Sequence, residues 1–375
     1  MKTIYILTIH FGVNHGSALQ AYALNRFLAK NGYQVKTIDY VPQRYNLWKG
    51  YYESKRDRFS LPLILLYYPL YLAKVLPNRV RFEHFLNNYI PLTQKIVDRT
   101  KLPIIGNEAD CYIVGSDQVW NDDYNGKEDN SYFLDFVTNG KKRVAYAASF
   151  GKEVLSEQYF ERIISYLQKF DFISLRENTT ISRLGASGIS AIHVCDPTML
   201  LDKEEWNAFV NVPNVINTPY LLVYVMDGKY ERLLDWAYQI KKKFSYEIYV
   251  VSFNKIKDSR IDKQFTSILP NQFITLISGA KCVVTNSFHG TVFSIIYCVP
   301  SIIIGKEKYN SRMQSLLQKL KLDKRFKSAE SEVEISEIGQ YIDEVDDLIS
   351  AQVVLDKWRL ESGNALLKVL DQEDI

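Results

Sequence analysis

The sequence predicts an α/β protein made of two Rossmann-like domains that face each other across a cleft. Three observations support this fold class. Short apolar runs alternate with helical stretches along most of the chain, the runs fall into two series that divide near residue 204, and 375 residues exceed one typical core. We therefore expect an N-terminal domain over 1–203, a C-terminal domain over 204–345 and a final segment over 346–375.

The first forty residues contain a strand, a turn, a helix and a second strand. The strand is predicted over 3–9 and the turn is "HFGVNHGS". The helix is predicted over 18–30, and Gly32 stops it. The next predicted strand is "YQVKTIDYV". This is a βαβ unit of the Rossmann-like kind. It lacks the GxGxxG pattern, so it does not predict a bound dinucleotide.

The same alternation continues through both series. In the first, the strands "CYIVGS", "RVAYAAS", "DFISLRE" and "AIHVCDP" are accompanied by helices over 156–170 and 179–184. In the second, the strands are "PYLLVYVMD", "EIYVVSF", "CVVTNS" and "SIIIG", with helices near 229–243, 271–279 and 291–298. A final amphipathic helix over 350–371 has no strand after it, and we expect it to cross back onto the first domain.

One segment, 45–92, interrupts this rhythm with "LPLILLYYPLYLAKVLP". The apolar stretch 61–76 is too short for a transmembrane helix and is broken by Pro62, Pro69 and a lysine. The favoured interpretation is a helical insert that packs on the first domain. The alternative is a peripheral contact of 61–76 with a membrane surface, suggested by its aromatic residues and the cations beside it.

Composition narrows the class of protein. The net charge of +3, without a basic block, argues against a nucleic-acid partner. The N-terminal "MKTIYILTIH" is predicted to be a strand and not a signal peptide, and the four cysteines are too widely spaced to suggest metal ligands or disulfides. These features predict a cytoplasmic protein, with attachment to the inner face of the cell membrane as the alternative.

Polar side chains gather where predicted strands end, which is where open α/β sheets bind ligands. In "GSDQVWN", Asp117 either orients a hydroxyl or acts as a base, or it simply caps a helix. In "SLRE", Arg176 offers a planar fork for a carboxylate or phosphate, or it pairs with Glu177. The "NHGSALQ" turn of the first domain supplies further candidates, Asn14, His15, Ser17 and Gln20.

The fourth such turn lies in "VVTNSFHGTVFS", between a predicted strand and a predicted helix. It places His289 at the carboxyl end of the strand and beside a helix start, where backbone N–H groups favour an anion. In the alternative interpretation, Asn286 and Ser287 are ordinary caps and Gly290 only permits a tight turn. Spacing alone does not separate the two.

Six blocks together resemble the polysaccharide pyruvyl transferase family. They are "NHGSALQAYAL", "YIVGSDQVWN", "YAASFG", "SLRE", "CDPTMLL" and "VVTNSFHGTVFSIIY", in the order of the family and spanning roughly residues 4–300. The later "NSRMQSLLQKLKL" is similar to its closing block. The insert and the last forty residues match no block.

The resemblance implies the two-domain arrangement called GT-B and transfer of a pyruvyl group from phosphoenolpyruvate to a sugar. The product would be a cyclic ketal on two hydroxyls of one residue, in a bacterial surface polysaccharide. The implied partners are phosphoenolpyruvate, as a co-substrate, and a sugar or lipid-linked oligosaccharide acceptor. No cofactor is expected, and no metal-ligand cluster is visible.

The resemblance also implies that His289 and Arg176 serve the donor. Many members carry Arg two positions before this histidine, where this chain has Ser287, so a second cation is expected from Arg312, Lys306 or Lys308. Asp117 is expected to activate the attacking hydroxyl. The residues expected to bind the donor are Arg176, Ser287, Gly290, Thr291 and Arg312. Those expected to bind the acceptor are Asn14, His15, Ser17, Gln20 and Gln118.

Two other functions remain open at this stage. A nucleotide-sugar-dependent glycosyltransferase of the same two-domain shape would also bind a phosphate at a helix start of the second domain. A non-catalytic glycan-binding or scaffold protein would use the same fold and would tolerate the loss of His289.

Overall fold

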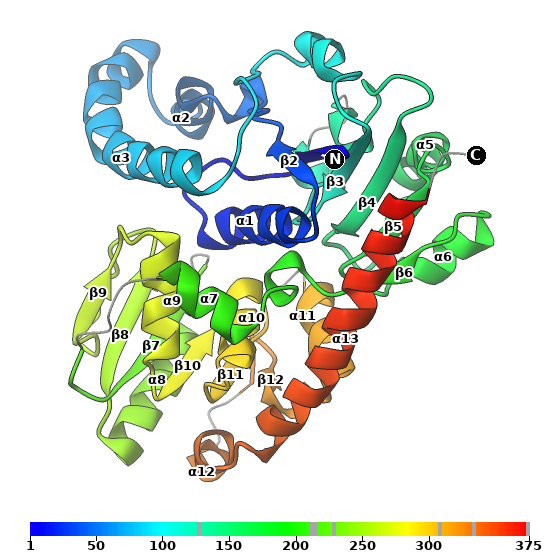
Figure 1. Cartoon of the computed structure of the whole chain (residues 1–375). Helices are drawn as coiled ribbons and strands as arrows, with labels where there is room; N and C mark the ends of the chain where they lie inside the picture. The colour runs from blue at the N-terminus through cyan, green and yellow to red at the C-terminus, as the bar shows by residue number, and fades with distance from the viewer. Residues whose placement is uncertain (126–128, 211–215, 227–229, 307–309, 332–334, 373–375) are drawn as a thin grey trace.

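Two parallel six-stranded sheets form the centres of two domains in a computed structural model of the chain (Figure 1). The structure describes residues 1–375 except 126–128, 211–215, 227–229, 307–309, 332–334 and 373–375. The predicted fold class is confirmed. Apolar strand residues that are almost entirely buried make up the middle of each sheet.

The first sheet has the order β2-β1-β3-β4-β5-β6, and every neighbouring pair is parallel. Its strands are β1 (Thr3–Leu7), β2 (Gln34–Thr37), β3 (Cys111–Gly115), β4 (Lys142–Ala148), β5 (Phe172–Leu175) and β6 (Ile192–His193). The helices of this domain include α1 (His15–Lys30), α4 (Asp122–Asn125), α5 (Glu157–Leu167) and α6 (Ile181–Ala186).

The second sheet has the order β12-β11-β10-β7-β8-β9, which is the strand order of a Rossmann fold. Its strands are β7 (Tyr220–Val225), β8 (Glu247–Ser252), β9 (Lys263–Phe265), β10 (Cys282–Thr285), β11 (Ser301–Ile304) and β12 (Phe326–Lys327). The helices that accompany them are α8 (Glu231–Phe244), α9 (Pro270–Ser278), α10 (Phe288–Ile296), α11 (Ser311–Leu320) and α12 (Ile335–Asp343).

Each sheet has one point where its strand order reverses, and open α/β folds bind ligands at such points. In the first sheet this point lies between β1 and β3, and in the second it lies between β7 and β10. The segments that follow β1, β3 and β10 are three of the four polar turns that the sequence marks as candidates, and the fourth follows β5. The topology therefore assigns the site to the place where these two edges meet.

The two domains share one apolar core. It joins residues of α1, α9, α10, α7 (Lys203–Val210) and the last helix, α13 (Asp346–Asp371). Figure 1 shows α13, in red, running along one side of both domains. It begins beside Arg325 of the second domain and ends where Lys2 of the first domain donates to the carbonyl of Leu370. The predicted crossing of this helix is confirmed.

The insert is helical, as the favoured interpretation predicts. It consists of α2 (Leu47–Lys55) and α3 (Leu61–Tyr89), which accommodates Pro62 in its first turn and Pro69 and Pro77 in its interior. In the described part of the chain, α3 and every other helix are too short or too polar to cross a membrane.

Several boundaries differ from those predicted. The helix expected over 291–298 begins at Phe288, so His289 lies in its first turn and not in the loop before it. The helix expected from residue 18 likewise begins at His15. Both shifts have the same cause, because the Asn14 and Ser287 side chains cap backbone N–H groups and extend each helix by about one turn.

Candidate active site

The turn after β10 is built by its own polar side chains. Ser287 caps α10 by accepting a bond from the Gly290 N–H, and its own N–H donates to the Thr285 hydroxyl. This fixes the first turn of α10 and places the His289 side chain, only 6 % exposed, at the boundary between the domains.

Gly16, in the first turn of α1, lies directly against the His289 ring. A Cβ atom at position 16 would come within 2.0 Å of Nδ1 and 2.4 Å of Cγ of that ring. Glycine is therefore required there by a contact between the domains and not by a turn. The N-terminal ends of α1 and α10, each with partly positive backbone groups, converge on this histidine.

Asp196, which follows β6, connects the charged groups of the site. Its carboxylate accepts a bond of 2.8 Å from Nη1 of Arg176 and one of 2.9 Å from the Ser116 hydroxyl. On its other oxygen it lies 3.8 Å from Nε2 of His289. Arg176 and His289 thus lie on either side of one fully buried carboxylate.

Two arginines flank the Phe288 ring. The Cζ atom of Arg176 lies 4.7 Å from the ring centroid and that of Arg312 lies 5.7 Å from it. An aromatic face stabilises cations that have lost water, and it holds both guanidinium groups near the His289 turn. Arg312, from the first turn of α11, is thus a second cation close to the turn where Ser287 carries no charge.

Four buried polar atoms of the site make no hydrogen bond within the described residues. They are Nε2 of His289, Nε of Arg312, and Nε and Nη2 of Arg176, the last of which lies 3.5 Å from Asp117. Buried donors without partners are costly, and such groups usually await a ligand or water. The two arginines lie against the Phe288 ring, and His289 is its neighbour on α10.

Asp117 closes the site on the side of the first domain. It has a backbone φ of 67°, a left-handed conformation that is uncommon outside glycine and typical of functional turns. Its carboxylate accepts a 2.6 Å bond from the Ser17 hydroxyl and faces Arg176. Asp117 and Ser17 therefore meet across the point where the first sheet reverses its strand order.

The electrostatic balance keeps the carboxylates charged and the histidine neutral. Burial, assisted by the nearby arginines, lowers the pKa of His289 to about 4 despite the attraction of Asp196. Burial would raise the pKa of Asp196, but His289, Arg176 and the Thr198 hydroxyl bring it down to about 2. The pKa of Asp117 also shifts downward, because Arg176 and other partners outweigh its burial.

Two residues predicted to bind the acceptor are hydrogen-bonded inside the closed molecule. His15 is 3 % exposed, receives a hydrogen bond at Nδ1 from the Tyr224 hydroxyl, and donates from Nε2 to the carbonyl of Ile268. Both of its nitrogens are therefore paired across the domain interface. Gln20 is fully buried, and its amide donates to Thr8, Ile9 and Ser17.

The remaining predicted residues occupy varied places. Asn14 caps α1, Gln118 lies beside Gly151 and accepts from Asn121, and the fully buried Thr291 hydroxyl donates back to the Ser287 carbonyl. Gly290 allows close approach of α10 to Thr285 and Tyr224. Of the alternative cations, Lys306 follows β11, and Lys308 lies outside the described residues.

Asp196 and Phe288 belong to the site but were not predicted as site residues. Asp196 was visible as the carboxylate of "CDP" after a predicted strand, at the same sheet edge as Arg176. Phe288 had no sequence signal beyond its position next to His289. Among the described residues, no group of three or more His, Cys, Asp or Glu is placed to hold a metal ion.

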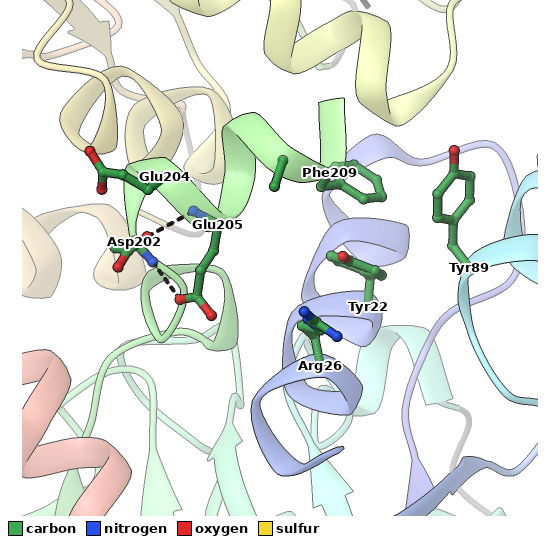
Figure 2. A pocket seen from close by; sticks show the side chains of 8 residues that line it. Tyr22, Arg26, Tyr89, Asp202, Glu204, Glu205 and Phe209 are labelled. Carbon is green, nitrogen blue, oxygen red and sulfur yellow. Dashed lines mark hydrogen bonds between the residues drawn. The ribbon is translucent and has the colours of Figure 1, made fainter. Parts of the chain in front are cut away.

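A surface pocket of about 490 Å³ lies along α1 and away from these charged groups (Figure 2). At this pocket the Tyr22 ring of α1 packs against Phe209 of α7 and Tyr89 of α3, with centroids 4.3 and 6.3 Å away, and Arg26 lies next to Tyr22. Asp202 and Glu205 at its edge are occupied in capping α7, and Glu205 also pairs with Lys30.

The fold and the site define a GT-B-type α/β protein whose two domains meet at a buried cluster of charged side chains. The family model "Polysaccharide pyruvyl transferase" matches residues 14–306, so the chain belongs to this family of transferases of polysaccharide biosynthesis. None of the curated proteins compared with the chain matches it.

Solved structures support the fold alone. A UDP-N-acetylglucosamine 2-epimerase from Rickettsia bellii is 11 % identical, with 99 % of this chain and 96 % of that chain covered and a TM-score of 0.54. The UDP-GlcNAc 2-epimerases of Neisseria meningitidis and Methanocaldococcus jannaschii are 9 % and 13 % identical, with 99 % of both chains covered in each comparison and TM-scores of 0.53 and 0.52.

Proposed function

We propose that the chain transfers the enolpyruvyl group of phosphoenolpyruvate onto two hydroxyls of one sugar as a cyclic ketal, in a bacterial surface polysaccharide. The observation that carries the proposal is the set of unpartnered buried donors on His289, Arg176 and Arg312, which lie close to the Phe288 ring. Phosphoenolpyruvate has a carboxylate and a phosphate, which matches two guanidinium groups and a helix N-terminus.

The reaction begins with protonation of the methylene carbon of phosphoenolpyruvate, and His289 is the residue we assign to this step. The imidazole is neutral in the free protein because its pKa is about 4. A bound dianion beside Nε2 favours the imidazolium and raises this pKa, so the substrate itself creates the acid. Asp196, whose carboxylate lies 3.8 Å from the same Nε2 atom, adds a second negative charge that favours the imidazolium.

The first sugar hydroxyl then attacks the adjacent carbon, and Asp117 accepts its proton. A carboxylate of low pKa is a weak base, but the carbon made electrophilic by protonation requires only a weak one. The second hydroxyl displaces the phosphate from the same carbon, and its proton leaves with the phosphate. The products are the ketal and inorganic phosphate, with no oxidant, reductant or metal consumed.

Access to the site requires the domains to separate. His289 is 6 % and Arg176 2 % exposed, so phosphoenolpyruvate cannot reach them while Gly16 lies against the imidazole ring. We propose that the donor enters an open form and that closure returns α1 to the ring and excludes water.

The test compares the protein with a His289→Gln variant, which fills similar volume; His289→Ala would leave a cavity at the domain interface. Phosphate release from phosphoenolpyruvate with a galactose-type acceptor should fall by about 10²–10⁴-fold. The ketal methyl group should appear by NMR only with the unaltered protein. A variant that melts like the parent and retains its rate would reduce His289 to a structural residue.

Thermal shift with two ligands separates this proposal from a nucleotide-sugar transferase. A smaller pocket of about 270 Å³ lies at the carboxyl ends of β7 and β8, lined by Met226 and Asn254 among others. It is the feature that favours the second candidate. Stabilisation by UDP-GlcNAc and not by phosphoenolpyruvate would replace the proposed reaction with glycosyl transfer.

A further inference from the structure

The outer face of α3 carries a continuous apolar stripe. Leu63, Leu66, Leu70, Pro77 and Val80 recur at the three- and four-residue spacing of one helix face, and all of them are exposed. Leu66 and Leu70 are each 67 % exposed and Val80 is 58 % exposed. The whole stretch 59–73 has no charged side chain. An exposed apolar face of this length marks a site of interaction.

The inner face of the same helix is already satisfied. Ile64 is 2 % exposed, and the rings of Tyr68 and Tyr71 pack against Trp48 and Tyr51 of α2. The helix α3 therefore has one side that packs against the protein and, in addition, an exposed apolar stripe.

The charge around the stripe is strongly positive. Residues 49–81 contain seven Lys and Arg but only Glu53 and Asp57 as acids, although the whole chain has a net charge of only +3. The exposed cations of this segment are Lys49 of α2, Arg56 and Arg58 between α2 and α3, and Lys74 of α3. Apolar residues between cations, with Tyr and Trp beside them, are what an anionic lipid surface binds.

We propose that α3 lies on the surface of an anionic membrane, with the stripe in the acyl boundary and the cations on the lipid headgroups. A second copy of this chain is less suited to the face, because a two-fold dimer would bring the two basic segments together. The 29 residues of α3 are long enough to cross a membrane, but the helix is not apolar enough to do so.

The position of α3 links the membrane to the active site. Its second half buries Phe82 against the His15 ring, 5.5 Å away, and His15 precedes the glycine that touches His289. Asn78 and Arg81 donate to the carbonyls of Thr266 and Ser267 in the second domain. This part of the proposal rests on the proposed function, since it makes the acceptor a sugar carried on a lipid.

Vesicle sedimentation tests the membrane contact without any reaction. The protein should bind vesicles of phosphatidylcholine mixed with phosphatidylglycerol and not vesicles of phosphatidylcholine alone. Leu66→Glu/Leu70→Glu should lower binding on the order of tenfold or more, and Arg56→Gln/Arg58→Gln about twentyfold at low salt. The matched control is Val353→Glu/Leu360→Glu, which makes the same kind of change at two exposed apolar residues of a different helix, α13.

Three results would overturn the proposal. The unaltered protein remains in the supernatant with anionic vesicles, the α3 variant binds as well as the parent, or light scattering shows a dimer that only the α3 variant dissociates. Ketal formation gives a separate reading: the α3 variant should retain its rate on a soluble acceptor and lose rate on an acceptor embedded in vesicles. Failure of the chemistry on both acceptors, with vesicle binding intact, would remove the proposed function alone.

Discussion

Arg312 and Asp117 both face Arg176, but they carry opposite charges and lie on different domains. Burial and Arg176 lower the pKa of Arg312 to about 10, so it stays charged at neutral pH. Its partly desolvated charge is best satisfied by an anion. Asp117 is ionised and bonded to Ser17, which suits it to a neutral hydroxyl and not to the donor.

These two residues should therefore fail in different ways. Arg312→Gln removes a contact to phosphoenolpyruvate and should raise its KM by about tenfold or more, since a charge-assisted bond contributes about 1.5–3 kcal/mol. Asp117→Asn should lower kcat by about a hundredfold and leave the KM for phosphoenolpyruvate nearly unchanged. Steady-state kinetics with phosphate detection measures both. Equal effects of the two variants on KM would show that Asp117 binds the donor.

At the scale of elements, the same local pattern occurs twice with different outcomes. Each domain has a His–Gly pair in the first turn of the helix at its switch point, His15–Gly16 on α1 and His289–Gly290 on α10. The sequence predicts both strand ends and both caps, because these depend on neighbouring residues. It does not show which histidine is used structurally, because Tyr224 and Ile268 belong to the opposite domain.

Sheet order explains what else the sequence missed. The "CDP" segment follows a two-residue edge strand, and its importance depends on β6 lying beside β5, which places Asp196 next to Arg176. A single sequence does not give that order. Both short strands β9 and β12 were also missed, because three and two residues are too few to show a periodicity.

The contact between α1 and α10 gives a prediction about glycine. Gly16→Ala places a methyl group on the His289 ring, so the ring or the helix must move, and a displacement of about 1 Å costs on the order of 10²-fold in rate. Gly185→Ala on α6 is the control, because nothing lies within 4 Å of its Cβ position and alanine there should add about 0.5–1 kcal/mol. Comparable kcat/KM values for both variants would mean that the His289 ring does not lie against residue 16 during the reaction.

Over the whole molecule, buried neutral histidines hold the two domains together. His15 belongs to the first domain, yet its ring stacks on Phe253 and Phe273 of the second, with centroids 5.7 and 5.0 Å away. Its hydrogen bonds require the tautomer with the proton on Nε2, because a carbonyl oxygen can only accept. A second proton would place a charge among aromatic rings.

Acid should therefore destabilise the closed molecule through these histidines, starting at a pH well above the ordinary pKa of carboxyl groups. Burial lowers the pKa of His15, His193 and His289 to about 4 each, below the ordinary value of 6.5. The unfolded chain binds protons first, so the free energy of unfolding is fully retained above pH 6.5, falls as the pH drops toward 4, and levels off below it with respect to these groups. Each fully buried histidine contributes up to about 3 kcal/mol over this window.

Urea unfolding at several pH values between 6.5 and 4 measures how steeply the free energy of unfolding changes with pH. His15→Gln, which cannot take the proton, should flatten it, whereas His84→Gln at an exposed position controls for the loss of a histidine as such. An unchanged slope in the His15 variant would mean that this ring is not buried in the interface in solution.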